Sequence, residues 1–346
     1  MRNKPGICPL VRAFAVLLWL LMLPVSAFCT GTEAEVVDVD ISVDSVSRSY
    51  ALPIDFSSGS VPKSGGFSES KGENGKTVRI YDDSTIHVEI SEGSWKGPEG
   101  NWNGTDVWLA DIVISDSSQL RTASMGNEPD FSNKKARGKA VTLAKHMNAV
   151  VALNGDSWGA DEKSGYGVVF RQGQLIAAKL DDSGRHRMDL LLIDENGDFH
   201  GIHAAQQGDL DDPSVYEGKQ ILNVFSFGPI LVENGELVTD YQGTDRDKGG
   251  TWMNMRTDLA SQRVALCQAG PLHYKIITCA GHRSGNRGLT LPEFAEFVAS
   301  QDVQFAYNLD GGESSVLYFW EYGKVNMKNT DVRNLWDIIY FASAEQ

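Results

Sequence analysis

Two segments of the sequence place an asparagine and an aspartate two residues apart at the end of an apolar run. Asn154 and Asp156 end one run, and Asn308 and Asp310 end the other. Side chains two apart on an extended segment point to the same side, so each run would present an amide and a carboxylate together. A single copy is more typical of a turn, but two copies in the same context indicate a ligand site, where carboxylates serve acid–base chemistry. The adjoining glycines allow close approach of a ligand or of another main chain: Gly155, Gly311 and Gly312.

Each run follows a segment with helical spacing. Residues 132–147 carry alanines, Val141 and Met147 at intervals of three to four, which predicts a helix before the apolar strand 149–153. The second segment opens with Thr290 and Glu293, the spacing of a capping box, and continues with an apolar stripe into the strand 303–309. Ligands of α/β folds lie at such strand ends, which places the expected site there.

Short alternating or apolar runs separated by turn residues fill the rest of the chain, and 35 glycines against 11 prolines fit many tight turns. They predict an α/β fold with a strand-rich mixed sheet and flanking helices, in one domain over residues 76–346. The expected strands are 77–81, 85–90, 107–114, 167–170, 175–178, 188–193, 199–202, 221–225 and 229–232.

The N-terminus has the pattern of an export signal. Basic residues precede the apolar stretch 13–23, which ends at Pro24 before the small residues around Ala27. We therefore expect a signal peptide over 1–27, a polar linker or disordered segment over 28–75, and a secreted or cell-surface protein. An uncleaved membrane anchor is the alternative, although the apolar stretch is shorter than the roughly 20 residues that a span needs. A lipoprotein attached through Cys29 is less favoured, because the bulky Phe28 precedes it.

The composition excludes some partners. The chain has 31 Lys and Arg against 46 Asp and Glu, a net charge of -15, and no clustered basic run, so nucleic acid is not an expected partner. The four cysteines show no CxxC spacing, which argues against a metal–thiolate site. A bridge between Cys267 and Cys279 is compatible with the spacing but is not implied by it. Nothing in the sequence fixes an oligomeric state.

Several motifs together resemble the phosphodiester glycosidase family over roughly residues 85–343. Members of that family include an enzyme that removes N-acetylglucosamine from a phosphodiester, and bacterial proteins described as exopolysaccharide-related. The resemblance implies an α/β domain that hydrolyses a sugar-1-phosphodiester in a surface or extracellular glycan. The motifs that carry it are Asn154-Gly155-Asp156, Phe227-Gly228-Pro229, Arg263-Val264-Ala265, Gly281-His282-Arg283, Gly288-Leu289-Thr290 and Asn308-Leu309-Asp310-Gly311-Gly312-Glu313-Ser314-Ser315.

This resemblance implies roles for the residues that match it. Asp156 and Asp310 become the candidate carboxylates, one to attack the sugar or activate water and the other to stabilise an oxocarbenium-like transition state. Arg263 and Arg283 become the candidate cations, because a guanidinium can hold phosphate through two parallel hydrogen bonds. The expected substrate-binding residues are Asn154, Gly155, Gly228, His282, Thr290, Asn308, Gly311, Gly312 and Ser314.

The sequence departs from the family pattern at several positions, among them Gly281 or His282 in place of an aspartate and Glu313 in place of a third glycine. Two alternatives to the glycosidase therefore stay open: a non-catalytic glycan-binding surface protein, and a metal-dependent phosphodiesterase that cuts the phosphorus–oxygen bond. Catalysis without a metal is favoured slightly. Ca²⁺ among Asp and Asn oxygens is the alternative cofactor, although no EF-hand-type loop is present.

Overall fold

The structure is a computed structural model, and the residues that it describes belong to the compact unit Ser42–Gln346. The expected signal peptide, most of the expected linker, and Ser157 and Trp158 lie outside the described residues. No helix in the described ranges is long and apolar enough to cross a membrane. The described residues are 52, 57–73, 75–97, 104–125, 136–156, 167–180, 188–239, 257–327 and 330–345.

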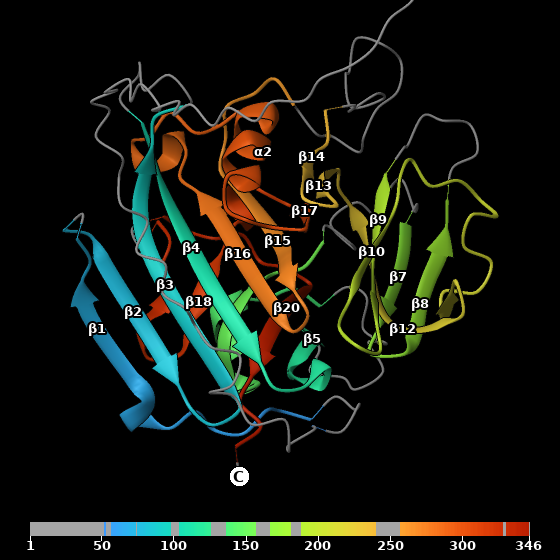
Figure 1. Cartoon of the computed structure of the whole chain (residues 1–346), viewed down its shortest axis with the longest axis horizontal. Helices are drawn as coiled ribbons and strands as arrows, with labels where there is room; N and C mark the ends of the chain where they lie inside the picture. Colours follow the sequence, from blue (N-terminus) through green and yellow to red (C-terminus); the bar gives the residue numbers. More distant parts are fainter. Residues whose placement is uncertain are drawn as a thin grey trace, which may run out of the picture. The chain divides into compact units, whose positions relative to one another are not determined.

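A nine-stranded sheet forms the largest layer (Figure 1). Alternation of buried and partly exposed residues along the second and third strands gives it one face toward the core. Its order is β1 (Phe67–Lys71), β2 (Thr77–Asp82), β3 (Ile86–Trp95), β4 (Thr105–Ile114), β16 (His273–Cys279), β15 (Arg263–Gly270), β17 (Phe305–Leu309), β13 (Ile230–Glu233) and β14 (Glu236–Leu237).

Two smaller sheets complete the described strands. One runs in the order β10 (Phe199–Ile202), β9 (Asp189–Asp194), β12 (Lys219–Phe227), β7 (Gly167–Arg171) and β8 (Gln174–Lys179), with β11 (Val215–Tyr216) paired to β12. The other runs in the order β19 (Gly323–Lys324), β18 (Leu317–Phe319), β6 (Ala149–Asn154), β20 (Asp337–Ala342) and β5 (Leu120–Ser124).

Every pair of neighbouring strands in the described residues is antiparallel. The strand-rich fold is therefore confirmed, whereas the expected mixture of parallel and antiparallel neighbours differs from the structure. Parallel neighbours need a crossover connection, whereas many successive strands here pair with each other directly, among them β1 with β2, β7 with β8 and β15 with β16. The strands β6 and β17, which end the two helix–strand units, lie in different sheets.

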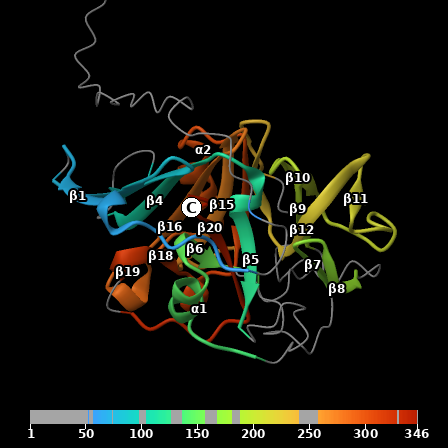
Figure 2. The ribbon, with the colours of Figure 1, turned by 90° about the horizontal axis from the view of Figure 1, so that it is seen from below.

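Two α-helices occur in the described residues, and each packs its apolar face on a sheet. The helix α1 (Ala140–His146) lies against β6 and β20 (Figure 2), and α2 (Leu291–Ala299) packs on β13 and β15. The predicted helix over 132–147 begins only at Ala140 within the described residues. It begins there because Gly138 forms a β-bridge with Leu335.

The predicted linker is shorter than expected at its C-terminal end. Residues 67–71 form β1 and pair with β2, and Ser60 forms a bridge with Ser343. Four of the five residues of β1 are exposed, because it is the edge strand of its sheet, so its sequence lacks an apolar face. The folded unit therefore includes residues that polarity alone assigns to a linker.

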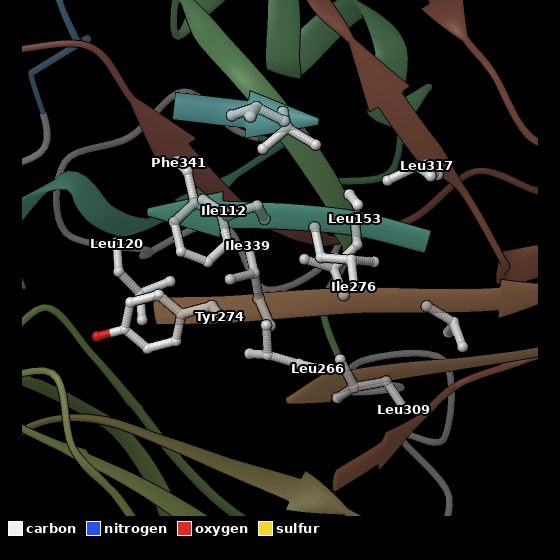
Figure 3. Packing of buried hydrophobic residues seen from close by; sticks show 14 of the residues in the cluster. Ile112, Leu120, Leu153, Leu266, Tyr274, Ile276, Leu309, Leu317, Ile339 and Phe341 are labelled. Atoms are coloured by element: carbon white, nitrogen blue, oxygen red, sulfur yellow. The ribbon is translucent and has the colours of Figure 1, made fainter. Parts of the chain in front are cut away.

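The three sheets share one hydrophobic core. Figure 3 shows Leu153, Ile276 and Leu317 close together, on strands of the five-stranded and nine-stranded sheets. The six-stranded sheet adds Leu191 and Phe225 to the same group of buried side chains. The strand ends of all three sheets are thus held in fixed positions by common packing, which is what a precisely built site requires.

Candidate active site

The two asparagine–aspartate segments meet, although they end strands of different sheets. The Asn154 side chain donates a hydrogen bond from Nδ2 to the main-chain carbonyl of Asp310 at 2.9 Å. It also accepts one at Oδ1 from the Val316 amide at 3.3 Å. Asn154 is buried, so its amide joins the end of β6 to the turn after β17 and positions both aspartates. The antiparallel arrangement means that this site is a junction of sheets and not one edge of a parallel sheet.

Asn308 has a comparable positioning role at the end of β17. Its Nδ2 donates to the Gly228 carbonyl at 2.8 Å, and the Gly228 amide donates to the Asn308 carbonyl at 3.1 Å. Gly228 has a φ of +82°, which a residue with a side chain rarely adopts. Both predicted binding residues are buried and hold the β12–β13 connection against β17.

Asp156 belongs to a buried ion triad that comprises Asp156, Arg171 and Asp337. The Arg171 guanidinium donates from NH2 to Asp156 Oδ2 at 2.9 Å and from Nε to Asp337 Oδ2 at 3.1 Å. The Ser226 amide also donates to Asp156 Oδ2, at 3.1 Å. Arg171 lies over the Phe225 ring, with 4.0 Å from its Cζ to the ring centroid. The Asp156 side chain is only 1% exposed, so this carboxylate is a fixed internal charge.

The proton balance of the triad follows from its contacts. Burial opposes the charge on Arg171, but Asp156 and Asp337 together raise the pKa of its guanidinium. Burial raises the pKa of Asp337 to about 7, against the effect of Arg171 and with support from the charge on Asp156. Asp337 Oδ1 is buried and makes no hydrogen bond. The arginine therefore pairs chiefly with Asp156, and Asp337 is the member that takes up a proton near neutral pH.

Asp310 is the more accessible of the two predicted carboxylates. Its side chain is 17% exposed, and its Oδ2 accepts a hydrogen bond from Ser314 Oγ at 2.5 Å. Arg333 NH1 lies 3.9 Å from the same oxygen. Burial raises the pKa of Asp310, Arg333 and Ser314 lower it, and the charge on Asp156 raises it further. The two predicted aspartates thus interact electrostatically, and Asp310 is the one whose side chain reaches solvent.

The predicted glycines serve close packing of main chains. A Cβ at Gly155 would lie 2.1 Å from Asp337 Oδ1, and one at Gly311 would lie 2.4 Å from the Gln262 carbonyl oxygen. Gly312 has a φ of +57°, and its amide donates to the same Gln262 carbonyl at 3.0 Å. These three glycines therefore bring β15, β17 and β20 together near Asp310. They serve the close approach of protein segments, which is one of the two roles expected from the sequence; the other was the close approach of a ligand.

Arg263 lies in the interior and holds main-chain carbonyls. Its Nε donates to the Leu289 carbonyl at 3.2 Å and its NH2 to the Leu259 carbonyl at 2.7 Å. Burial lowers the pKa of Arg263 to about 10, which still leaves it charged at neutral pH. With 6% of the residue exposed, this arginine ties the start of β15 to its surroundings.

Arg283 has a different setting from Arg263. It lies in a short 3-10 helix, His282–Ser284, next to the exposed His282, and its side chain is 49% exposed. Its guanidinium forms an ion pair with Glu313, one of the residues that departs from the family pattern. The Glu313 pair brings Arg283 next to the turn that follows Asp310, and its role as a phosphate ligand stays a prediction.

Thr290 is the N-cap of α2. Its Oγ1 accepts a hydrogen bond from the Glu293 amide at 3.4 Å, and Glu293 Oε2 accepts from the Thr290 amide at 2.8 Å. Arg287 donates two further hydrogen bonds to the Glu293 carboxylate, at 2.8 and 2.9 Å. The capping box predicted from the sequence is confirmed, and it engages the Thr290 hydroxyl within the protein.

Three charged residues of this site were not identified from the sequence. Arg171 and Asp337 lie at the end and at the start of fully buried strands, and a charged residue bordering an apolar run is the only signal that could have indicated them. Arg333 lies outside the described strands, and nothing in its sequence context distinguishes it. Its position beside Asp310 depends on a long-range hydrogen bond from its amide to the Glu313 carbonyl, at 3.0 Å.

Within the described residues, no group of three or more His, Cys, Asp or Glu side chains is arranged to hold a metal ion. Asp156 and Asp337 are bridged by the guanidinium of Arg171, and Asp310 lies beside Arg333. A Ca²⁺ requirement stays a prediction. Cys267 and Cys279 are both buried and free.

Comparison with known proteins identifies a family for this chain. The family model for phosphodiester glycosidases matches residues 147–342, more than half of the chain, from just before β6 to the end of β20. No curated protein matches the chain significantly. Among solved structures, the catalytic domain of zebrafish N-acetylglucosamine-1-phosphodiester alpha-N-acetylglucosaminidase, auto-inhibited by its pro-peptide, is similar in fold. Its sequence identity is 16%, with 80% of this chain and 87% of that chain covered and a TM-score of 0.56.

Two further structures cover similar shares of the chain. A hypothetical protein from Synechocystis has 15% identity, with 80% of this chain and 68% of that chain covered and a TM-score of 0.48. A putative exported protein from Burkholderia pseudomallei has 10% identity, with 85% and 99% covered and a TM-score of 0.46. The matched range of the family model includes all the residues of the site described above. The chain belongs to the phosphodiester glycosidase family.

Proposed function

We propose that this protein is a hydrolase that cleaves the sugar carbon–oxygen bond of a sugar-1-phosphodiester, with Asp310 as the carboxylate that acts on the sugar. One observation carries the proposal. Asp310 is partly exposed, carries a raised pKa and lies beside the half-exposed Arg333, and Glu313 in the turn that follows it pairs with Arg283. A carboxylate with cations beside it is what a glycoside with a phosphate leaving group requires.

The chemistry of the leaving group determines which roles the protein residues must fill. Cleavage at the sugar carbon expels a phosphate monoester whose second pKa is roughly 6, so this group leaves with little proton donation. The demand on the protein is therefore to place a base or nucleophile at the sugar and cations at the phosphate. Asp310 fills the first role, and Arg333, with its side chain 42% exposed, fills the second.

Asp156 supports this chemistry without contacting the substrate. Its carboxylate is buried and paired with Arg171, yet its charge raises the pKa of Asp310. A base with a raised pKa binds a proton more strongly, which favours proton removal from an attacking water. Asp156 is thus a positioning residue. Its ion pair with Arg171 holds the Asp156 charge in place whether or not a substrate is bound.

We further propose that the substrate lies outside the cytoplasm, in a surface glycan or capsule-like polymer. The export pattern over residues 1–27 supports this location. The zebrafish enzyme is named for N-acetylglucosamine-1-phosphodiester, which makes that compound the first probe to use. An acidic protein with a few arginines at one site suits a single phosphate group better than a long polyanion.

The test is incubation of the purified protein, with residues 1–27 removed, with N-acetylglucosamine-1-phosphodiesters in ¹⁸O water, followed by mass spectrometry. Label in the released sugar is the expected result. Label in phosphate would replace the proposal with a phosphodiesterase, and binding without release would replace it with a glycan-binding protein.

The matched variants are Asp310→Asn and Asp211→Asn, the second changing an exposed aspartate outside the site. We expect D310N to lose at least about a thousandfold in kcat, as removal of an essential catalytic group does, while its melting temperature stays close to that of the wild type. D211N should retain full activity. Unchanged turnover in D310N would remove Asp310 from the reaction.

A further inference from the structure

The ion pair between Arg283 and Glu313 lies at the turn that follows Asp310. Glu313 is in the 3-10 helix Gly312–Ser314, and its side chain is 40% exposed. Its main-chain carbonyl accepts the hydrogen bond from the Arg333 amide at 3.0 Å. Glu313 therefore contacts both of the half-exposed arginines, one through its carboxylate and the other through its main chain.

The described charges around Asp310 do not leave an excess of positive charge. The seven groups joined by ion pairs comprise three cations and four carboxylates when all are ionised, and Arg137 acts on Asp337 as a further cation. Burial raises the pKa values of Asp310 and Asp337, and the negative charge on Asp156 raises both further. The seven are Arg171, Arg283, Arg333, Asp156, Asp310, Glu313 and Asp337.

We propose that Glu313 is a specificity-determining residue that makes this site select singly charged phosphodiesters over doubly charged phosphate monoesters. The Glu313 carboxylate occupies the position at Arg283 where a ligand oxygen would bind. The positive charge of Arg283 is therefore already neutralised when an anion enters the site. Arg333 then supplies the cation beside Asp310. This inference rests on the proposed function, because it concerns the same site and the same class of substrate.

The physical argument is one of charge. A phosphodiester carries one negative charge, whereas a monoester whose second pKa is roughly 6 carries two above neutral pH. One extra unit charge about 4 Å from a solvated carboxylate changes affinity by roughly five- to tenfold at a water-like dielectric, and by more where the dielectric is lower. Because a half-exposed salt bridge is itself weak, Glu313 does not block the site, and its effect is confined to the discrimination between the two charge states.

This charge preference also affects release of the product. A site that binds a monoanion better than a dianion releases its phosphate monoester product readily, since cleavage of the diester creates the second charge in place. Glu313 thus lowers product inhibition by the phosphate monoester. An enzyme without this carboxylate would hold the product through Arg283 and Arg333 together.

The experiment compares methyl phosphate with dimethyl phosphate at pH 8 by ³¹P NMR titration. In wild type, we expect dimethyl phosphate to bind at least as tightly as methyl phosphate. In Glu313→Gln, the ratio of the two dissociation constants should shift about tenfold toward methyl phosphate, because Arg283 is released. In the double variant Glu313→Gln with Arg283→Gln, that gain should disappear.

The matched control is Glu293→Gln, which alters another Arg–Glu pair, that of Arg287, at a helix cap where glutamine can also serve. It should leave the ratio within twofold of the wild-type ratio. A ratio unchanged in E313Q, or no binding of either probe to wild type and E313Q, overturns the inference. Turnover of the N-acetylglucosamine-1-phosphodiester is scored separately, so turnover with an unchanged ratio refutes the role of Glu313 alone and leaves the proposed function standing.

Discussion

The carboxylates of Asp156 and Asp310 lie in very different surroundings. Asp156 is enclosed, with Arg171 and the Ser226 amide on one oxygen, whereas Asp310 has access to solvent and a hydroxyl from Ser314. The residue type is the same, but the environment makes Asp156 a fixed charge and leaves Asp310 accessible, which under the proposed function makes it the reacting group. Such a separation of two acids by environment is a recurring way to divide catalytic roles.

Substitution of Arg333 tests the electrostatic part of that division. Arg333 lowers the pKa of Asp310, so Arg333→Gln should raise it. If Asp310 acts as a base or nucleophile, activity is lost as pH falls through its pKa, and the acidic limb of the kcat/KM profile should move to higher pH in R333Q. The measurement is the pH profile of kcat/KM for both proteins.

The control for this prediction is Arg287→Gln, since Arg287 is similarly exposed but pairs with Glu293. Its profile should overlay that of the wild type. If instead the alkaline limb moves to higher pH in R333Q while the acidic limb stays in place, Asp310 works in its protonated form as an acid.

At the scale of single residues, part of the candidate site could be located from the sequence. The paired strand ends led to Asn154, Asp156, Asn308 and Asp310, all of which the structure brings to one junction. What the sequence could not give was the direction of a long side chain. Arg263 matched a family motif but extends to main-chain carbonyls in the interior.

The cap of α2 shows how an element holds residues that a motif assigns to binding. Thr290, Glu293 and Arg287 form one hydrogen-bonded group at the helix N-terminus. The Thr290 hydroxyl is engaged there, so its effect on the site acts through the helix that packs against β13 and β15.

Thr290→Ala should therefore destabilise the protein by about 1 kcal/mol, the usual cost of losing an N-cap, with little change in kcat/KM. Thr290→Ser should restore the stability, because serine caps a helix equally well. Urea unfolding measures the first quantity and steady-state kinetics the second. A large fall in kcat/KM at normal stability would instead indicate that Thr290 binds the substrate.

Close packing of β6 against β20 at Gly155 is a second feature of the elements. A Cβ there would lie 2.1 Å from the Asp337 carboxylate, whereas a Cβ at Gly65 would have no neighbour within 4 Å. We expect Gly155→Ala to destabilise by about 1 to 3 kcal/mol, as overpacking does, and Gly65→Ala to have almost no effect. Thermal denaturation of the two variants decides this, and equal melting temperatures would contradict it.

Strands with one apolar face were predictable, and those without one were not. The alternation along β2 and β3, and the apolar run of β6, identified these strands from the sequence. The edge strand β1 has mostly exposed residues, so its pairing is dictated by β2 and not by its own composition. The antiparallel pairing of all three sheets depends on long-range contacts that periodicity does not encode.

At the scale of the molecule, the site needs all three sheets. The five-stranded sheet supplies Asn154 and Asp337, the six-stranded sheet supplies Arg171, and the nine-stranded sheet leads into Asp310. Since a shared core fixes these sheets, the stability of the fold and the charge state of the site are linked.

That linkage predicts a pH dependence of stability. The pKa of Asp337 is about 7 in the fold, above its ordinary value near 4, so the native state binds an extra proton between these values. The free energy of unfolding should then fall as pH rises from 4 to 7, by up to about 1.4 kcal/mol per pH unit from this group. Asp337→Asn removes the titration.

The measurement is urea unfolding of wild type and D337N at pH 5 and pH 7.5. The stability of the wild type relative to D337N should be greater at pH 5 than at pH 7.5. A relative stability that grows with pH would mean that Asp337 is held ionised by Arg171.

The position of β20 has a consequence for how the protein is made. This strand follows all the other described strands in the chain, yet it lies between β6 and β5 and completes the ion triad. A growing polypeptide must therefore wait, with the inner edges of β5 and β6 unsatisfied, until residues 337–342 have left the ribosome. Unpaired edges of this kind invite association with other chains, so a translation product that stops short of β20 should be a target for chaperones and proteases.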